Sequence, residues 1–516
     1  ALFIYLAITE AIGLIRKKAA GRTSDSTSVR LTSHVSQYDH IPAFLGALIF
    51  AVSPIFWSQA VVAEVYTLNA ALFTGLLWLS LRWMKNQWSD SSGSRFTAHG
   101  SQVLYLISFL WGLSLGNHHT MIAFLPVFLV FAGIYSVGVG LAPAQEGQPQ
   151  GLPLRLMSHF SLVTLFFLFG LSIYLYLPVR SGQNPFMDWG DTERVSGFLE
   201  VILRKQFGLG SRDYSLERAM AQTGYYLTLL REQFTMPGVF LGGIGLSFFI
   251  RRDFPASLFT LALFLTYGII TTLFLNPPYI DLGAMDVMVI PSFAVFSLWI
   301  GVGLLVVYKG IAAIFTKGLT IQKERTIVII TTLISMLMPV MVLYTNFYKN
   351  DQSNNTFAYD YAGDIFSGIE PKGVLFVDTD LSLFPLWYMQ YVEGKRQDVA
   401  VLNVDMLMLP WFKRQLKEKY PAVDIKVPDV MRHSKGGKFK PLSMEALVSY
   451  KVSQVGEMLN DLLDKHPVYL SYDFGVPFKE FGERKDIHAV QNGITFRVLK
   501  EEVSEEGISG SPPLKG

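Results

Sequence analysis

Long apolar segments recur through the first two thirds of this chain, and they restrict its fold more than any other feature. A membrane-spanning helix needs about 20 mainly apolar residues. Only 16% of the residues are charged, against about 25% in soluble domains. We therefore predict a polytopic α-helical membrane protein whose helical domain covers residues 1–347. About ten segments are candidate spans: residues 1–15, 41–57, 66–83, 103–115, 121–141, 158–179, 237–250, 255–275, 288–308 and 326–347.

Charge and cysteine content exclude several classes of protein. The 516 residues carry a net charge of +2, and no run of lysine and arginine suggests a DNA-binding face, so we expect no nucleic-acid partner. No cysteine is present, so no disulfide can form. The chain begins at Ala1, without methionine and inside an apolar segment. We expect the first part of the natural protein, including part of the first span, to be missing.

Basic residues near the span ends predict the orientation, because cytoplasmic loops are enriched in lysine and arginine. Arg16, Lys85, Arg155, Arg251 and Lys309 all fall on one side of the predicted spans. With this side in the cytoplasm, the loop 180–236 and everything after residue 347 are extracytoplasmic. The same assignment places every conspicuous polar cluster of the spans on the outer side.

A change of composition after residue 347 indicates a second domain. Short β-branched segments at 373–377, 399–404 and 468–472 alternate with helix-like stretches, which is typical of a small α/β domain. We assign residues 348–500 to it and expect 501–516 to form a flexible tail. No glycine-rich phosphate loop follows any of these strands, so no nucleotide cofactor is expected.

The stretch 56–69, FWSQAVVAEVYTLN, carries a carboxylate, Glu64, inside a nearly unbroken apolar block. A charge at membrane depth costs about 2.5–3.5 kcal/mol on insertion scales, so it usually faces a protein interior or a wet cavity. In the alternative interpretation this stretch is an interfacial anchor, with Trp57 and Tyr66 among the headgroups and Glu64 in water.

The segment Asn117-His118-His119-Thr120 separates two apolar spans. It is either a polar helix break or the wall of a pocket that touches a phosphate or a sugar hydroxyl. Adjacent histidines point in different directions, and the chain has neither cysteine nor an HExxH motif, so we expect no metal site.

Further polar residues lie in the later outer loops. Arg180 follows a span and either reaches the interface by snorkelling or binds a lipid phosphate. Asp188 and Asp191 flank Trp189 and a glycine, either in a turn that caps a helix or in a site. Asp281 and Asp286 precede a late span, and in the simpler interpretation they are ordinary loop acids.

Together these residues suggest a pocket at the outer membrane surface. Carboxylates can accept a proton from an acceptor hydroxyl, and cations can stabilise a departing phosphate. Such a pocket suits transfer of a group from a lipid-phosphate donor.

Several motifs resemble those of the plexin-type protein O-mannosyltransferases and their bacterial relatives of unknown function, which are similar to the glycosyltransferase-C superfamily. They follow one another from about residue 50 to 412 and together are specific. They are residues 56–69; residues 112–120 (GLSLGNHHT); Leu177-Pro178-Val179, Trp189-Gly190-Asp191 and Gly197-Phe198-Leu199; and residues 386–394 (LWYMQYVEG) with Arg396, Asp398 and Val399.

The resemblance implies an inverting transfer of a hexose such as mannose from a polyprenyl-phosphate donor to a protein or glycan acceptor on the extracytoplasmic face. It also favours a bacterial inner membrane. Glu64 and Asp191 would then be catalytic, and Asn117, His118, His119, Arg180, Asp188, Trp189 and Asp286 would bind substrate.

Two departures from the family pattern stand out. The acidic first outer loop of the family, expected to hold the main catalytic base, would precede Ala1, so we expect this piece alone to be inactive. The family's acidic-Arg-aromatic step is Asp286-Val287-Met288 here, without the arginine.

Two other functions stay open. A flippase for lipid-linked sugars would show paired repeats and acids at mid-membrane, and we find no repeat. A receptor or scaffold that binds through its outer domain would leave the polar residues of the spans without a role.

Overall fold

The computed structural model of the chain describes residues 1–20, 38–87, 98–138, 152–185, 187–204, 214–276, 283, 285–315, 321–423, 455–456, 458–473 and 487–500. Two compact units can be distinguished. We call Ala1–Tyr174 with Asp213–Gln352 the helical unit, and Leu175–Arg212 with Ser353–Gly516 the α/β unit. The predicted fold class, a polytopic helical protein with a small α/β domain, is confirmed. Asp281 and the expected tail 501–516 lie outside the described residues.

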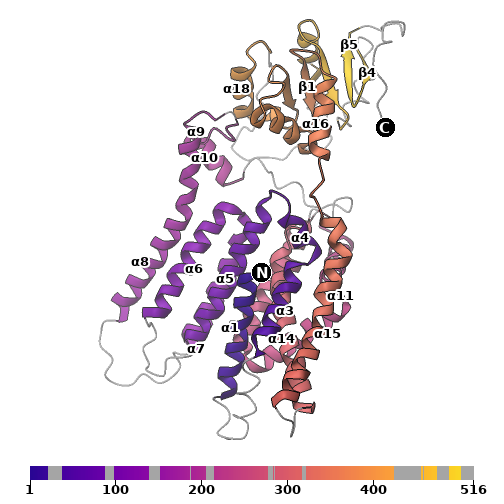
Figure 1. Cartoon of the computed structure of the whole chain (residues 1–516). Coiled ribbons are helices and arrows are strands. Elements are labelled where there is room, and N and C mark those ends of the chain that lie inside the picture. Colours follow the sequence, from indigo (N-terminus) through magenta and orange to yellow (C-terminus); the bar gives the residue numbers. More distant parts are fainter. Residues whose placement is uncertain are drawn as a thin grey trace. The chain divides into compact units, whose positions relative to one another are not determined.

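The helical unit is built almost entirely of long apolar helices (Figure 1). They are α1 (Leu2–Ala20), α3 (His40–Ala51), α4 (Pro54–Ala60), α5 (Val65–Gln87), α6 (Ala98–Asn117), η2 (His119–Ala123), α7 (Phe124–Gly138), α8 (Leu152–Leu171), α11 (Leu216–Arg252), α12 (Phe254–Leu265), η4 (Thr266–Ile270), α13 (Thr271–Leu275), α14 (Ile290–Phe315) and α15 (Ile321–Asn350).

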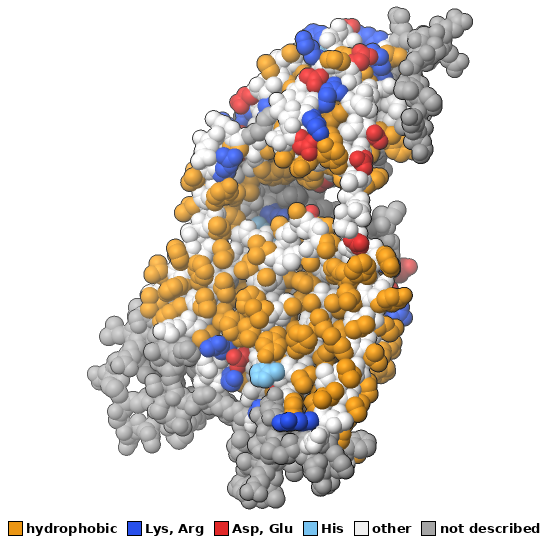
Figure 2. Space-filling view, in the orientation of Figure 1, with side chains coloured by type: hydrophobic (Ala, Val, Ile, Leu, Met, Phe, Trp, Pro, Cys, Tyr) orange, Lys and Arg blue, Asp and Glu red, His pale blue; other side chains and the backbone are white. Residues whose placement is uncertain are grey.

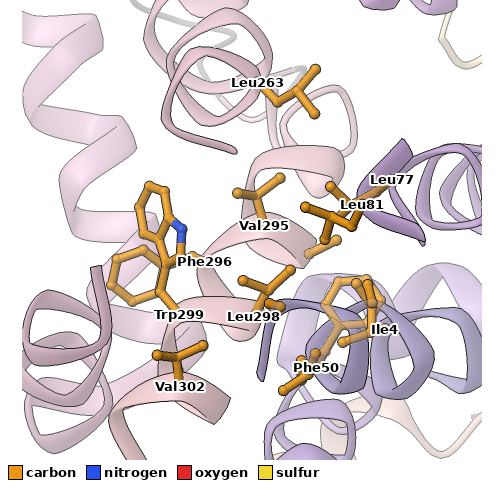
Figure 3. Packing of buried hydrophobic residues seen from close by; sticks show 14 of the residues in the cluster. Ile4, Phe50, Leu77, Leu81, Leu263, Val295, Phe296, Leu298, Trp299 and Val302 are labelled. Carbon is orange, nitrogen blue, oxygen red and sulfur yellow. The ribbon is translucent and has the colours of Figure 1, made fainter. Parts of the chain in front are cut away.

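Helix α14 forms the centre of the helical unit because it is apolar on every side. Its Val295, Leu298 and Trp299 belong to the same buried cluster as Ile4 of α1 and Phe50 of α3 (Figure 3). The apolar window of this helix is 89% buried, whereas that of α15 is only 17% buried. An apolar helix left uncovered by protein is suited to face lipid, and hydrophobic side chains cover the visible face of the helical unit (Figure 2).

Among the described residues, five helical segments are long and apolar enough to cross a membrane: Phe160–Ser181, Leu216–Arg252, Phe254–Leu275, Ile290–Ile311 and Arg325–Asn350. They become six if the pair His40–Ala51 and Pro54–Ala60, bent by 67°, is one broken span. The chain is therefore a multi-pass membrane protein. The further predicted spans are helices α1, α5, α6 and α7, and the total of about ten stays a prediction.

Two breaks in the helices lie beside prolines. At Pro54 the chain bends, and the N–H of Ile55 donates to Oε1 of Gln233 at 2.9 Å, so a neighbouring helix satisfies the freed backbone. Within α11 the chain kinks at Thr235, two residues before Pro237, with φ of 59°. Residues 216–234 of the predicted outer loop and the predicted span 237–250 are thus the two halves of α11.

Glycines let two helices of the helical unit approach closely. A Cβ at Gly112 of α6 would lie 2.2 Å from the carbonyl oxygen of Phe167, and one at Gly170 of α8 would lie 2.1 Å from that of Phe109. Small residues at membrane helix interfaces allow such backbone contact. The glycine of the GLSL motif therefore has a packing role.

The α/β unit contains a five-stranded sheet in the order β2-β1-β3-β5-β4. Strands β1 (Val374–Val377), β2 (Ala400–Asn403) and β3 (Val468–Ser471) are parallel and fully buried, which confirms the three predicted strands. The hairpin of β4 (His488–Asn492) and β5 (Thr495–Leu499) is antiparallel and was missed by the sequence analysis. The helical elements of this unit are α9 (Tyr176–Ser181), α10 (Val195–Ile202), α16 (Phe357–Ser367), α17 (Asp380–Trp387), η6 (Tyr388–Val392), η7 (Met406–Met408) and α18 (Pro410–Lys419).

Candidate functional site

The predicted site residues are divided between the two units. Glu64, Asn117, His118, His119 and Asp286 belong to the helical unit, whereas Arg180, Asp188, Trp189 and Asp191 belong to the α/β unit. Each group is built by contacts within its own unit. Their convergence into a single cleft stays a prediction.

In the helical unit, the beginning of α5 meets the end of α6. Nδ2 of Asn117 donates to the carbonyl oxygen of Val65 at 3.1 Å. The rings of Tyr66 and His118 lie with their centroids 5.7 Å apart. Residues that are more than 50 positions apart in the sequence are thereby brought together, and Glu64 immediately precedes this junction. We call Glu64, Tyr66, Asn117, His118 and His119 the helix-end cluster.

The two adjacent histidines have different surroundings, as their spacing predicts. His118 is buried, and its Nδ1 lies 2.7 Å from the hydroxyl of Thr120 and accepts a hydrogen bond from the N–H of Thr120, so it caps η2. His119 is the first residue of η2 and is half-buried. The hydroxyl of Tyr267 donates to the carbonyl oxygen of Thr120 at 3.2 Å and ties η4 to the same segment.

Glu64 is exposed, and its carboxylate makes no hydrogen bond or ion pair with any residue that the structure describes. It lies at the opposite end of α5 from Lys85, which pairs with Glu10 at 2.7 Å. Lys85 lies 20 positions after Val65, which corresponds to about 30 Å of helix. The helical unit thus has a basic end, where Arg16 also pairs with Asp39, and a distant end that carries Glu64.

Asp286 lies just before α14 and is held by α11. The hydroxyl of Tyr225 donates to Oδ1 of Asp286 at 2.8 Å. Burial raises the pKa of Asp286 above its ordinary value, and the hydrogen bond from Tyr225 opposes this shift. Asp286 is a half-buried acid with a defined partner.

In the α/β unit, a turn of acidic residues packs against helix α18. The hydroxyl of Ser181 lies between the carboxylates of Asp188 and Glu193 and donates to Asp188 at 2.8 Å. The N–H of Asp188 donates to Oε1 of Gln415 at 3.4 Å. Burial raises the pKa of Asp188 above its usual value. We call Asp188, Trp189, Asp191 and Glu193 the acidic turn.

Asp191 and Trp189 are also held by α18. Nε of Arg414 donates to Oδ2 of Asp191 at 2.9 Å, and the rings of Trp189 and Trp411 are 5.2 Å apart. A Cβ at Gly197 would lie 2.2 Å from the carbonyl oxygen of Gly190, so the turn requires a glycine in α10. The third family motif therefore builds a fixed turn in which Asp191 is already paired with Arg414.

The acidic turn is also a candidate cation site that the sequence analysis did not predict. Oxygen atoms of Asp188, Asp191 and Glu193 all lie within 4.8 Å of one another. Arg414 supplies a positive charge to the same group, so the pair Asp191–Arg414 already neutralises one of the three carboxylates.

Arg180 lies at the end of the span Phe160–Ser181. It is exposed, and its guanidinium donates to Oε1 of Gln183 at 2.9 Å. This placement agrees with both predicted interpretations, because a guanidinium at a span end can snorkel or bind a phosphate.

The fourth family motif supports the fold of the α/β unit. Gln390 is fully buried and donates to the carbonyl oxygens of Arg396 and Val399 at 2.8 Å each. Arg396 donates to the carbonyl oxygen of Ile369, beyond the end of α16, and pairs with Asp398 at 3.0 Å. These side chains satisfy backbone carbonyl oxygens of residues that belong to no helix or strand.

Comparisons with known proteins agree with the predicted resemblance. Residues 1–137 match the family model described as the protein O-mannosyl-transferase TMEM260 N-terminal domain. Residues 358–447 match the model described as TMEM260-associated domain 2. All residues of the helix-end cluster fall within the first matched segment. No solved structure matches the chain.

Two curated relatives are similar to the chain over most of its length. The protein O-mannosyl-transferase tmem260 of Dictyostelium discoideum is 22% identical over 507 residues, which cover 93% of this chain and 58% of the relative. The protein O-mannosyl-transferase TMEM260 of Mus musculus is 25% identical over 406 residues, which cover 74% of this chain and 52% of the relative. The chain thus spans about half the length of these relatives. The chain is distantly similar to the TMEM260-type protein O-mannosyltransferases, which confirms the resemblance that its motifs predicted.

Proposed function

We propose that this chain forms the membrane part of a glycosyltransferase. It transfers a hexose such as mannose from a polyprenyl-phosphate donor to a hydroxyl of a protein or glycan acceptor, on the extracytoplasmic face. The observation that carries this proposal is the helix-end cluster, in which Asn117 binds the carbonyl oxygen of Val65 and His118 meets the ring of Tyr66, directly after the exposed carboxylate of Glu64 in the sequence.

The roles follow from chemistry. In an inverting transfer the acceptor oxygen forms a bond to C1 of the sugar, while the bond from C1 to the phosphate oxygen breaks and the lipid phosphate leaves. The acceptor proton must be removed, and within this chain Glu64 is our candidate for a carboxylate that takes part in this step, because it is exposed and unpaired among the described residues. Asn117 and His119 offer hydrogen bonds to the sugar.

Charge on the departing phosphate needs a cation. Arg180 stands at a span end with an exposed guanidinium, and a guanidinium binds phosphate in a bidentate manner. Asp188, Trp189 and Asp286 are proposed to line the donor site. Asp191 is proposed to act with them, although its carboxylate is held by Arg414.

The test is transfer of labelled mannose from a polyprenyl-phosphate donor to an acceptor peptide by the natural protein in proteoliposomes. We expect labelled peptide and free polyprenyl phosphate in equal amounts. Absence of transfer with every acceptor, together with movement of the intact donor across the bilayer, would replace this proposal by the flippase.

A further inference from the structure

Helix α5 carries a stripe of three side chains that begins with Tyr66 of the helix-end cluster. Tyr66, Asn69 and Phe73 stand at positions i, i+3 and i+7 and therefore share one face of the helix. Tyr66 meets the ring of His118. Phe73 meets the ring of Tyr267, with centroids 4.8 Å apart. Asn69 lies between these two residues on the same face of the helix.

Asn69 is unusual because its amide is buried without a complete set of partners. The residue is 4% exposed, and its Oδ1 has no hydrogen-bond partner among the described residues. Buried polar groups in native proteins are nearly always paired, and an unpaired one destabilises the fold. A group that supplies the missing hydrogen bond from outside the chain would explain why an amide stands at this position.

The chemistry of the amide selects the class of ligand. An unpaired amide oxygen needs a donor, which a fully ionised phosphate lacks. If the amide is rotated by half a turn, the unpaired group is the NH₂, which needs an acceptor. A hydroxyl meets both needs. The stripe carries no charged side chain, so the ligand portion that it contacts is neutral.

We propose that Asn69 binds a hydroxyl group of the sugar, beside the rings of Tyr66 and His118. This inference rests on the proposed function, because it names a residue that would hold the sugar of the donor. It assigns Asn69 to binding and gives it no role in proton transfer.

A second buried polar group provides a matched control. Thr272 of α13 is fully buried, and its Oγ1 also has no partner among the described residues. It lies four residues after Gly268, which touches Tyr226, and four before Asn276, which accepts from Gln222 at 3.0 Å. Thr272 therefore faces α11, away from the helix-end cluster.

The experiment compares Asn69→Leu with Thr272→Val, each close in size to the native residue. Methyl α-mannoside, which has neither lipid nor phosphate, is the probe, and its binding to the purified protein is followed by ligand-observed NMR and by thermal shift. We expect Asn69→Leu to weaken mannoside binding at least fivefold and Thr272→Val to leave it unchanged. Both variants should raise the melting temperature of the ligand-free protein, because each removes an unpaired buried polar group.

Three outcomes would overturn the inference: equal mannoside affinity in Asn69→Leu and the native protein, no mannoside binding by the native protein, or a lower melting temperature for ligand-free Asn69→Leu. The last would show that the amide is paired in the fold. If sugar binding depends on Asn69 but no transfer to any acceptor occurs, the proposed function fails while the sugar-binding residue stands.

Discussion

The helix-end cluster and the acidic turn both come from motifs with carboxylates near the end of a predicted span, yet their acids are used differently. Glu64 is exposed and unpaired among the described residues. In the acidic turn, Ser181 donates to the carboxylate of Asp188, and Arg414 binds that of Asp191. A carboxylate that is already paired must break that pair before it can accept a proton. The comparison therefore favours Glu64 for chemistry and Asp191 for holding the turn.

The largest effect is expected from Glu64→Gln. Loss of a proton acceptor should lower the transfer rate by about 100-fold or more, while the melting temperature stays the same because the side chain is exposed. Transfer of labelled mannose checks the first part and a thermal melt the second. A native rate in Glu64→Gln would remove the contrast between the two clusters.

A second test asks whether Arg414 of α18 stabilises the acidic turn. Arg414→Met leaves the buried Asp191 without its charged partner and should destabilise this region by about 2 kcal/mol. Hydrogen exchange of α18 in the whole protein measures this. The control is Arg194→Met, because Arg194 is exposed and 3.8 Å from Glu193, and such surface pairs contribute about 0–1 kcal/mol. Equal protection of α18 in both variants would show that the acidic turn does not depend on Arg414.

The adjacent histidines sharpen the comparison inside the helix-end cluster. His118→Ala removes the cap of η2 and should lower the free energy of unfolding by about 1 kcal/mol. His119→Ala should change it by less than about 0.5 kcal/mol but lower transfer about tenfold, the loss of one hydrogen bond. Denaturation and transfer assays on both variants check this. If instead His118→Ala lowered transfer and His119→Ala lowered stability, His118 would be the substrate-binding residue and His119 the structural one.

The smallest effect concerns Lys419 at the end of α18. Burial lowers its pKa from 10.5 to about 8, so the folded chain loses this proton at a lower pH than the unfolded chain. The contribution of Lys419 to stability should therefore rise as the pH increases from about 8 to 10.5. Hydrogen exchange of α18, corrected for the intrinsic pH dependence, should show this slope. Lys419→Met should abolish it, and the exposed Lys417→Met should not.

Much of the fold was predictable because burial leaves a simple pattern. Spans such as 255–275 and 288–308 are long apolar segments, and the structure places helices α12–α13 and α14 there. Strands β1, β2 and β3 are buried on both faces and appear as continuous β-branched segments. Strand β4 alternates exposed and half-buried residues, including His488 and Gln491, so its sequence resembles a polar loop.

The site was predictable only in part. Its motifs identify Glu64 and Asn117, but the contact between Val65 and Asn117 depends on tertiary packing, which a local pattern does not encode. Arg414 carried no signal, because charged residues are common on an amphipathic surface helix. Asn69 did carry a signal in the sequence, because it is an amide within an apolar segment close to Glu64. A search for isolated polar residues in the spans would have found it.

A structure of the protein with a bound polyprenyl-phosphate mannose analogue that cannot react tests the central claim most directly. We predict that the sugar contacts Asn69 and Asn117, with its C1 facing Glu64. A sugar bound instead at the basic end, in the groove lined by Tyr38, Ile41 and Arg325, would contradict the assignment of the helix-end cluster as the transfer site.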